Sequence, residues 1–353
     1  MNHITQQKHY TEISATKGIL IILMVIGHSG APKWLAEPLS LVRMPCFFLI
    51  SGFLFKEKYL DEIRNYVTRK VKGLYIPFIK WSFIFLLLHN LFYYLNIYSI
   101  SYNINDYKHK IFQILTMTGS EQLLGGFWFL KELLYASIFS LFTFKLITSI
   151  NKKLSIRVLL TTSLVFALFS IMYSYANFKI PTIGSKTLLA TSYFIAGYAF
   201  HKINMIYTNI NKRGIGIFLF TVFVISSLYV KGSMENKGIS IIPYFAVSII
   251  ASVSTIYLTK YITGYLMKIL DYVGKNTLYI LIFHFLSFKI VSLFILMIEN
   301  LPYTNLSTFP VLEDRNGFMW VIYTIIGVVV PLLIKQAMDK LSYSCKGISK
   351  RVI

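Results

Sequence analysis

Long apolar segments recur along the whole chain and restrict its fold more than any other feature. Residues 277–298, TLYILIFHFLSFKIVSLFILMI, contain one lysine and no acidic residue. A helix that crosses a bilayer needs about 20 mainly apolar residues. Only 14% of the 353 residues are charged, whereas soluble globular domains carry roughly 25%. These segments predict an all-α polytopic membrane protein.

Hydropathy predicts about ten transmembrane helices in one membrane domain that covers residues 1–353. The expected ranges are 13–31, 36–55, 73–96, 124–146, 157–176, 185–201, 214–231, 239–260, 277–298 and 317–338. The longest predicted loop is 97–123. Because ten is an even number, both termini are expected on the same side of the membrane.

The net charge of +21 would point to nucleic acid in a soluble protein, but here membrane topology explains it. With a cytoplasmic N-terminus, the inner segments hold 23 of the 35 cations and the outer loops hold eight. The outer eight are Lys33, Lys108, Lys110, Lys179, Lys186, Lys231, Lys237 and Arg315. This bias follows the positive-inside rule. We therefore expect cytoplasmic termini, location in the cell membrane, contact with lipid and no nucleic-acid partner.

Four cations fall inside predicted spans: Arg43, Lys80, Lys131 and Lys289. A charge at the bilayer centre costs roughly 2.5–3.5 kcal/mol on insertion scales. Such residues usually face the bundle interior or a water-filled cavity. We expect Arg43 and Lys131 to face a polar chamber in the outer half of the membrane, whereas Lys80 is close enough to a helix end to snorkel.

The first span, TKGILIILMVIGH, places Lys17 and His28 eleven residues apart. On an α-helix this separation is three turns, about 16 Å, and returns to nearly the same face. Lys17 would lie at the cytoplasmic mouth and His28 well across the membrane. Imidazole suits general-base work at neutral pH. The alternative is that Lys17 is an interfacial anchor and His28 a hydrogen-bonded interfacial residue.

The second span contains the segment RMPCFFLISGFLF, from Arg43 to Phe55. Pro45 is expected to break or kink the start of this helix. The Ser51–Gly52 pair allows close helix contact. Arg43 either snorkels outward or binds an anionic or oxyanionic group.

A basic cluster, Arg69, Lys70 and Lys72, precedes the third span in VTRKVKGLYIPFIKW. Its simplest role is that of a solvated membrane anchor. Its more specific role is to bind the phosphates of a cytoplasmic donor through charge-assisted hydrogen bonds.

Two further segments carry polar residues at membrane depth. GGFWFLKELLYAS contains Trp128, an interfacial aromatic or cavity residue, and Lys131 beside Glu132, which we expect not to pair because sequence neighbours point about 100° apart. VGKNTLYILIFHF contains His284. No further ligand accompanies the two histidines at a spacing suited to zinc, so no metal site is predicted. Carboxylates that couple proton transport are nearly absent from the spans.

Taken in order, these segments resemble the acyltransferase family 3 of integral-membrane proteins. TKGILIILMVIGH resembles the opening helix of that family, in which a basic residue precedes a histidine by eleven positions. RMPCFFLISGFLF, RKVKGLYIPF, GGFWFL, ATSYFIAGY and VGKNTLYILIFH follow in the order of the family motifs. Three positions depart from the common pattern: Lys17 stands where many members have arginine, Ala15 stands about where many members have an acidic residue, and Arg43 stands where histidine is common.

The resemblance implies O-acylation, usually acetylation, of sugars in extracytoplasmic glycans such as O-antigen or capsule. Acyl-CoA, most often acetyl-CoA, would be the donor substrate, with no permanently bound cofactor. His28 would act as general base or carry the acyl group, with Lys17 and Arg43 also in the catalytic set. The expected substrate-binding residues are Ser51, Arg69, Lys70, Lys72, Trp128, Lys131 and His284.

Two other functions remain open. The chain is either a transporter or flippase for a lipid-linked sugar or acyl group, or an inactive partner in a glycan assembly complex. The sequence does not specify the acceptor sugar, the acyl chain or the oligomeric state.

Overall fold

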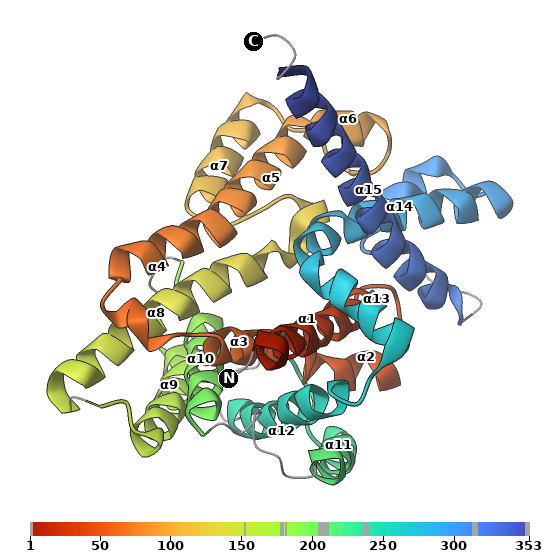
Figure 1. The fold of residues 1–353 in the computed structure, drawn as a ribbon. Coiled ribbons are helices and arrows are strands. Elements are labelled where there is room, and N and C mark those ends of the chain that lie inside the picture. The colour runs from red at the N-terminus through yellow and green to blue at the C-terminus, as the bar shows by residue number, and fades with distance from the viewer. Residues whose placement is uncertain are drawn as a thin grey trace.

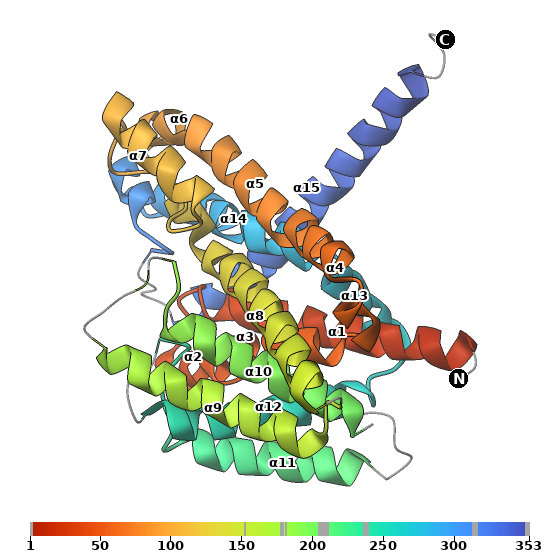
Figure 2. The same cartoon turned by 90° about the vertical axis from the view of Figure 1, so that its left-hand side faces the viewer.

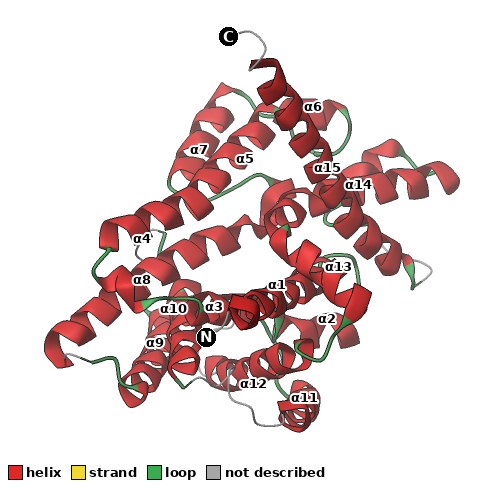
Figure 3. Cartoon of the chain, viewed as in Figure 1, coloured by secondary structure: helices red, strands yellow, loops and turns green. Residues whose placement is uncertain are grey.

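The computed structural model describes residues 3–151, 153–176, 180, 182–203, 212–235, 240–312 and 317–349. Within these ranges the chain is helical and contains no strand (Figure 3), which confirms the all-α prediction. The α-helices are α1 (His3–Ile26), α2 (Lys33–Ser40), α3 (Arg43–Phe53), α4 (Ile63–Lys70), α5 (Ile76–Leu87), α6 (His89–Tyr94), α7 (Ile104–Leu115), α8 (Trp128–Asn151), α9 (Ile156–Tyr175), α10 (Ser185–Lys202), α11 (Lys212–Ser227), α12 (Ile241–Thr259), α13 (Gly264–Lys275), α14 (Thr277–Ile298) and α15 (Met319–Ser349). Shorter helical turns are η1 (Glu57–Leu60), η2 (Val71–Tyr75), η3 (Gln122–Phe127) and η5 (Tyr303–Ser307).

Six helical stretches among the described residues are long and apolar enough to cross a membrane. They are Lys33–Phe53, Gln122–Ile150, Ile156–Tyr175, Ile241–Thr259, Thr277–Ile298 and Met319–Leu341. The count of ten spans and the orientation of the termini stay predictions. Of the cations assigned to outer loops, Lys179, Lys237 and Arg315 lie outside the described residues.

The predicted span 36–55 is two helices rather than one. α2 and α3 are separated at Leu41–Val42, and Pro45 lies in the first turn of α3. Proline has no backbone N–H, so the bond that a continuous helix would make to the Leu41 carbonyl is missing. The break leaves Arg43 at the first position of α3.

The predicted span 73–96 is also interrupted, between α5 and α6. The side chain of Asn90 donates to the Tyr102 carbonyl at 3.0 Å and accepts from the Tyr102 N–H at 2.8 Å. His89 lies 2.7 Å from the buried carboxylate of Glu121. These polar groups bind the segment predicted as the loop 97–123, which instead contains α7.

Four predicted spans match their helices closely: 157–176, 185–201, 239–260 and 277–298 correspond to α9, α10, α12 and α14. The boundaries of other predicted spans differ from the helices by a turn or more. α1 begins before residue 13 and ends at Ile26, so His28 lies in the turn after the helix. α15 continues past residue 338. α4 and α13 were not predicted, because short amphipathic helices lack the long apolar runs on which the prediction relied.

The helices form a bundle in which α1 and α3 lie between two groups. α9, α10, α12 and α11 lie together on one side, and α5, α14 and α15 lie on the other, with α8 running between them (Figures 1 and 2). The C-terminal part of α15 projects away from the bundle (Figure 2). α9 exposes an apolar face of Leu160, Leu164, Leu168 and Met172, as expected for a helix in contact with lipid.

Four glycines allow backbones to approach closely at two helix crossings. A Cβ at Gly52 on α3 would overlap the Phe194 carbonyl of α10, and one at Gly197 on α10 would overlap the Leu49 carbonyl of α3. Gly18 on α1 and Gly274 on α13 make the same reciprocal arrangement. Small residues at crossings are typical of helix association in membranes.

The crossing of α3 and α10 generates a stability prediction. We expect Gly197→Ala to lower the thermal unfolding temperature of the detergent-purified protein by several degrees, because the added methyl group must displace backbone rather than a flexible side chain. Gly214→Ala in α11 is the matched control, since a Cβ there meets no atom within 4 Å and alanine favours a helix interior by about 0.5–1 kcal/mol. Equal unfolding temperatures for both variants would show that the close approach is not required.

Candidate active site

Two histidines from distant parts of the sequence meet beside the end of α1. His28 follows α1 in a tight turn, and its backbone N–H bonds to the Val25 carbonyl at 3.0 Å. Its Nδ1 lies 3.3 Å from Nε2 of His284, a fully buried residue on α14. The rings are stacked, with centroids 5.4 Å apart. The structure therefore brings together the two histidines that the sequence analysis treated separately.

The hydrogen bonds around His284 determine the tautomer of both rings. Nδ1 of His284 lies 3.0 Å from the Ile280 carbonyl and 3.1 Å from the Leu281 carbonyl. Carbonyl oxygens only accept, so this nitrogen carries the proton and Nε2 of a neutral ring accepts. Nδ1 of His28 must then donate to His284. Nε2 of His28 keeps its lone pair, which is the form that a base requires.

Arg43 lies against the turn that carries His28. A Cβ at Gly27 would overlap Nη1 of Arg43, so the guanidinium packs directly on the glycine that precedes His28. Nη1 is buried and has no hydrogen-bond partner among the described residues. An unpaired buried donor is costly, and a carbonyl or oxyanion placed here would satisfy it.

An aromatic cluster and a buried lysine cover the histidine pair. Phe285 packs on His284 and His28, with ring centroids 4.0 and 5.0 Å away, and Phe309 packs on Phe285 at 4.7 Å. Lys289, 4% exposed, donates to the carbonyls of Leu306 and Thr308 at 2.9 and 2.6 Å. Lys289, which was predicted to lie inside the ninth span, thus binds the segment between α14 and α15 and holds that segment over the site.

An apolar cavity of about 200 Å³ leads toward this site. α1, α3 and α14 each contribute three lining residues, and η2 and α8 supply the others. The three series are Lys17, Ile21 and Met24 from α1; Met44, Phe47 and Ser51 from α3; and Thr277, Leu278 and Leu281 from α14. Each series runs toward a residue of the site: His28, Arg43 or His284. Met24, Met44 and Leu281, the members of the three series nearest in sequence to these residues, form the deep end, and neither histidine lines the cavity.

A second cavity, of about 300 Å³, adjoins the first and is basic. It shares Lys17 and Ser51 with the apolar cavity and is also lined by Tyr59, Arg69 and Lys70. No acidic residue lines it. Lys72, the third cation of the predicted phosphate site, is exposed and does not line this cavity.

Lys70 is the cation that this environment perturbs most. Its ammonium lies over the Tyr66 ring, 5.3 Å from the centroid. Burial, and then the charges of Lys17 and Arg69, lower the pKa of Lys70 to about 8. An anion bound in the cavity would remove much of this repulsion.

Trp128 and Lys131 lie apart from these two cavities. They line a third cavity, of about 540 Å³, together with Glu132, Tyr173 and Lys186. The Lys186 ammonium lies 5.0 Å from the Trp128 ring centroid. The expectation that Lys131 and Glu132 do not pair is wrong, because the flexible lysine side chain brings Nζ to 3.4 Å from Oε1.

Several parts of the site had no signal of their own in the sequence. Gly27 and Phe285 belong to apolar runs, and only the fold shows that they contact Arg43 or the histidines. Phe309 belongs to a predicted loop, and only the fold shows that it packs on Phe285. The described residues contain no group of three or more histidine, cysteine or acidic side chains that could hold a metal ion. The arrangement offers a base, a buried cation and an apolar approach, which suit acyl transfer.

Comparison with known proteins agrees with this chemistry. The model of acyltransferase family 3, described as an acyltransferase domain, matches residues 10–336. The chain belongs to the acyltransferase 3 family. No curated protein and no solved structure matches the chain. The match of this acyltransferase 3 protein contains both histidines and every residue that lines the apolar and basic cavities, so the chain is a membrane acyltransferase.

Lys70 provides a test of the basic cavity that does not require a substrate. At pH 8 we expect about half of its amines to be neutral, whereas an ordinary lysine of pKa about 10.4 is almost fully charged. Competitive labelling with acetic anhydride across pH 6 to 11, read by mass spectrometry, should give a midpoint near 8 for Lys70. A midpoint above 10 would contradict the burial and charge repulsion described here.

Proposed function

We propose that this acyltransferase 3 protein is an O-acetyltransferase of the cell membrane, with cytoplasmic termini. It would move an acetyl group from cytoplasmic acetyl-CoA to a hydroxyl of an extracytoplasmic or lipid-linked glycan. The observation that carries the proposal is the pair of adjoining cavities, which connects Arg69 and Lys70 to the surroundings of His28 and His284.

The two cavities match the two chemical parts of an acyl-CoA. The basic cavity, with three cations and no carboxylate among its lining residues, suits the diphosphate through charge-assisted hydrogen bonds. The narrow apolar cavity suits the thin pantetheine arm. The thioester would then lie beyond Met24 and Leu281, close to His28.

In the proposed reaction His28 is the general base. Its Nε2 takes the proton of the acceptor hydroxyl while the hydroxyl oxygen attacks the thioester carbonyl. Collapse of the tetrahedral intermediate breaks the C–S bond, and the proton passes from His28 to the leaving thiolate. His284 touches neither substrate and is a positioning residue. A route in which Nε2 of His28 first carries the acetyl group uses the same tautomer.

Arg43 would stabilise the oxyanion of the intermediate. Its unpaired Nη1 lies in a buried setting, where a charged donor is worth more than in water. The apolar cavity is lined in part by α8, and other residues of α8 line the cavity that contains Trp128 and Lys131. The cavity of Trp128 and Lys131 is our candidate for binding the acceptor glycan, since aromatic rings and polar side chains suit sugars.

The catalytic role of His28 is tested by acetyl analysis of the cell-surface glycan. We expect His28→Ala to abolish the base-labile acetyl ester, because no other described side chain offers a free imidazole nitrogen beside Arg43, while protein level and glycan length stay normal. Lys80→Ala, at an exposed lysine of α5, is the control and should leave the ester content unchanged.

Other outcomes point to the competing functions. Unchanged ester content with reduced flux of a lipid-linked sugar or acyl group would favour a transporter or flippase. Unchanged glycan in His28→Ala, Lys17→Ala and Arg43→Ala alike would favour an inactive partner of an assembly complex. Labelled acetyl-CoA supplied to inside-out vesicles then tests the donor and the side from which it enters.

The positioning role of His284 predicts a difference between two replacements. His284→Gln keeps an oxygen that can accept from Nδ1 of His28, whereas His284→Leu removes the acceptor. General-base catalysis contributes roughly 10²–10⁴ in rate, so we expect His284→Leu to lower kcat about 100-fold and His284→Gln about tenfold or less. KM for acetyl-CoA should stay unchanged in both. Equal losses of kcat would show that His284 acts only through packing.

A further inference from the structure

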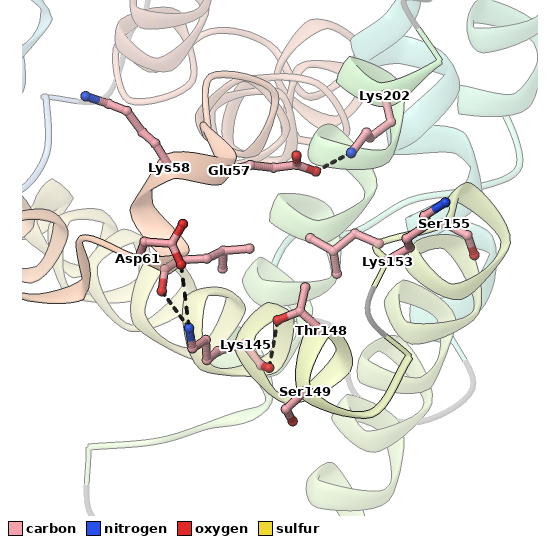
Figure 4. Close-up of a pocket in the computed structure, with 11 residues that line it drawn as sticks. Glu57, Lys58, Asp61, Lys145, Thr148, Ser149, Lys153, Ser155 and Lys202 are labelled. Atoms are coloured by element: carbon pink, nitrogen blue, oxygen red, sulfur yellow. Dashed lines mark hydrogen bonds and ion pairs between the residues drawn. The ribbon is translucent and has the colours of Figure 1, made fainter.

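A cavity larger than the three already described lies next to the basic one and has no part in the chemistry above. It measures about 800 Å³, within the roughly 300–1,000 Å³ typical of small-molecule sites. It lies between η1, the C-terminal part of α8, the start of α9 and the end of α10. Its lining residues are Glu57, Lys58, Leu60, Asp61, Lys145, Thr148, Ser149, Lys153, Leu154, Ser155 and Lys202 (Figure 4).

Only one helical turn separates this cavity from the basic cavity. Tyr59 lines the basic cavity, whereas its sequence neighbours Lys58 and Leu60 line the large one. Tyr59 also accepts a hydrogen bond from Arg69 at 3.1 Å. A ligand that fills the basic cavity and extends past η1 therefore enters the large cavity.

The charges of the large cavity leave an excess of lysine. Glu57 is paired with Lys202, and this pairing lowers the pKa of Glu57. Lys145 donates to the Leu60 carbonyl at 3.0 Å and lies 3.9 Å from Asp61 (Figure 4). Both carboxylates in the lining are thus already beside a cation.

Lys153 remains as a cation without an ion pair to any described residue. Lys58, the other lysine in excess, lies 3.9 Å from Glu62 and extends away from the other labelled side chains (Figure 4). Lys153 stands just before Ser155, which caps the first turn of α9 by accepting from the Val158 N–H at 3.4 Å. An anion beside Lys153 would also face the positive end of this helix.

We propose that this large cavity binds the nucleotide end of the acyl donor, with Lys153 paired to its ribose phosphate. The inference rests on the proposed function, since acyl-CoA carries a diphosphate near its centre and a separate phosphate at its nucleotide end. The diphosphate occupies the basic cavity, and the nucleotide extends past Tyr59. Donors without a nucleotide, such as acyl pantetheine, make none of these contacts.

The test compares two donors that differ in one phosphate, acetyl-CoA and acetyl-3′-dephospho-CoA. Thiol release by the full-length protein in lipid nanodiscs, with the isolated cell-surface glycan as acceptor, gives kcat/KM for each. We expect the wild-type protein to prefer acetyl-CoA by about tenfold, the size of one charge-assisted contact. Lys153→Ala should reduce this preference to near one, and Lys153→Glu should reverse it. Lys268→Ala, at an exposed lysine of α13 outside the cavity, should keep the wild-type preference.

Three results would overturn the proposal. The first is a wild-type protein that uses both donors equally, and the second is a Lys153→Ala variant that keeps the preference. The third concerns Lys153→Ala in nanodiscs of different lipids. If this variant lost kcat/KM equally with both donors, and only in nanodiscs that contain phosphatidylglycerol rather than phosphatidylcholine, the cavity would be assigned to a lipid headgroup. Failure of the proposed function is distinguishable, because neither donor would then release thiol with the wild-type protein.

Discussion

Close contact between helix backbones is the constraint on which the rest of the structure depends. In lipid, helices gain little from burying apolar side chains against each other, so packing distance decides how strongly they associate. Gly52 and Gly197 bring α3 against α10, and Gly18 and Gly274 bring α1 against α13. Since α14 follows α13 directly, the same contact that fixes α13 also fixes the helix that carries His284.

The site follows from this placement because both of its histidines are positioned by backbone groups. The His28 turn is held by bonds of its own backbone, and His284 is oriented by the carbonyls of its own helix. Arg43 reaches the site only because Gly27 leaves room for the guanidinium. Hydrogen bonds to backbone groups hold the histidine rings rigidly, and acid–base chemistry requires such fixed orientation.

The sequence predicted the all-α class and four helices closely, since long apolar runs report directly on burial. It did not predict the break at Leu88, because the partners of His89 and Asn90 lie in a segment that reads as a loop. It singled out His28, Arg43 and His284 one by one, from residue type and depth. Their meeting, and the separation of Trp128 and Lys131 from them, depend on helix packing that no single segment encodes.

The apolar stretch at Met24 and Leu281 has a consequence for the energy balance of the cell. A protein that let a continuous file of water connect the two faces of a bilayer would dissipate the membrane potential. Thioether and aliphatic side chains at the deep end offer water no hydrogen bonds. In the proposed function these side chains would admit a slender organic chain and still exclude a file of water, and they would shield the thioester from hydrolysis before its acceptor arrives.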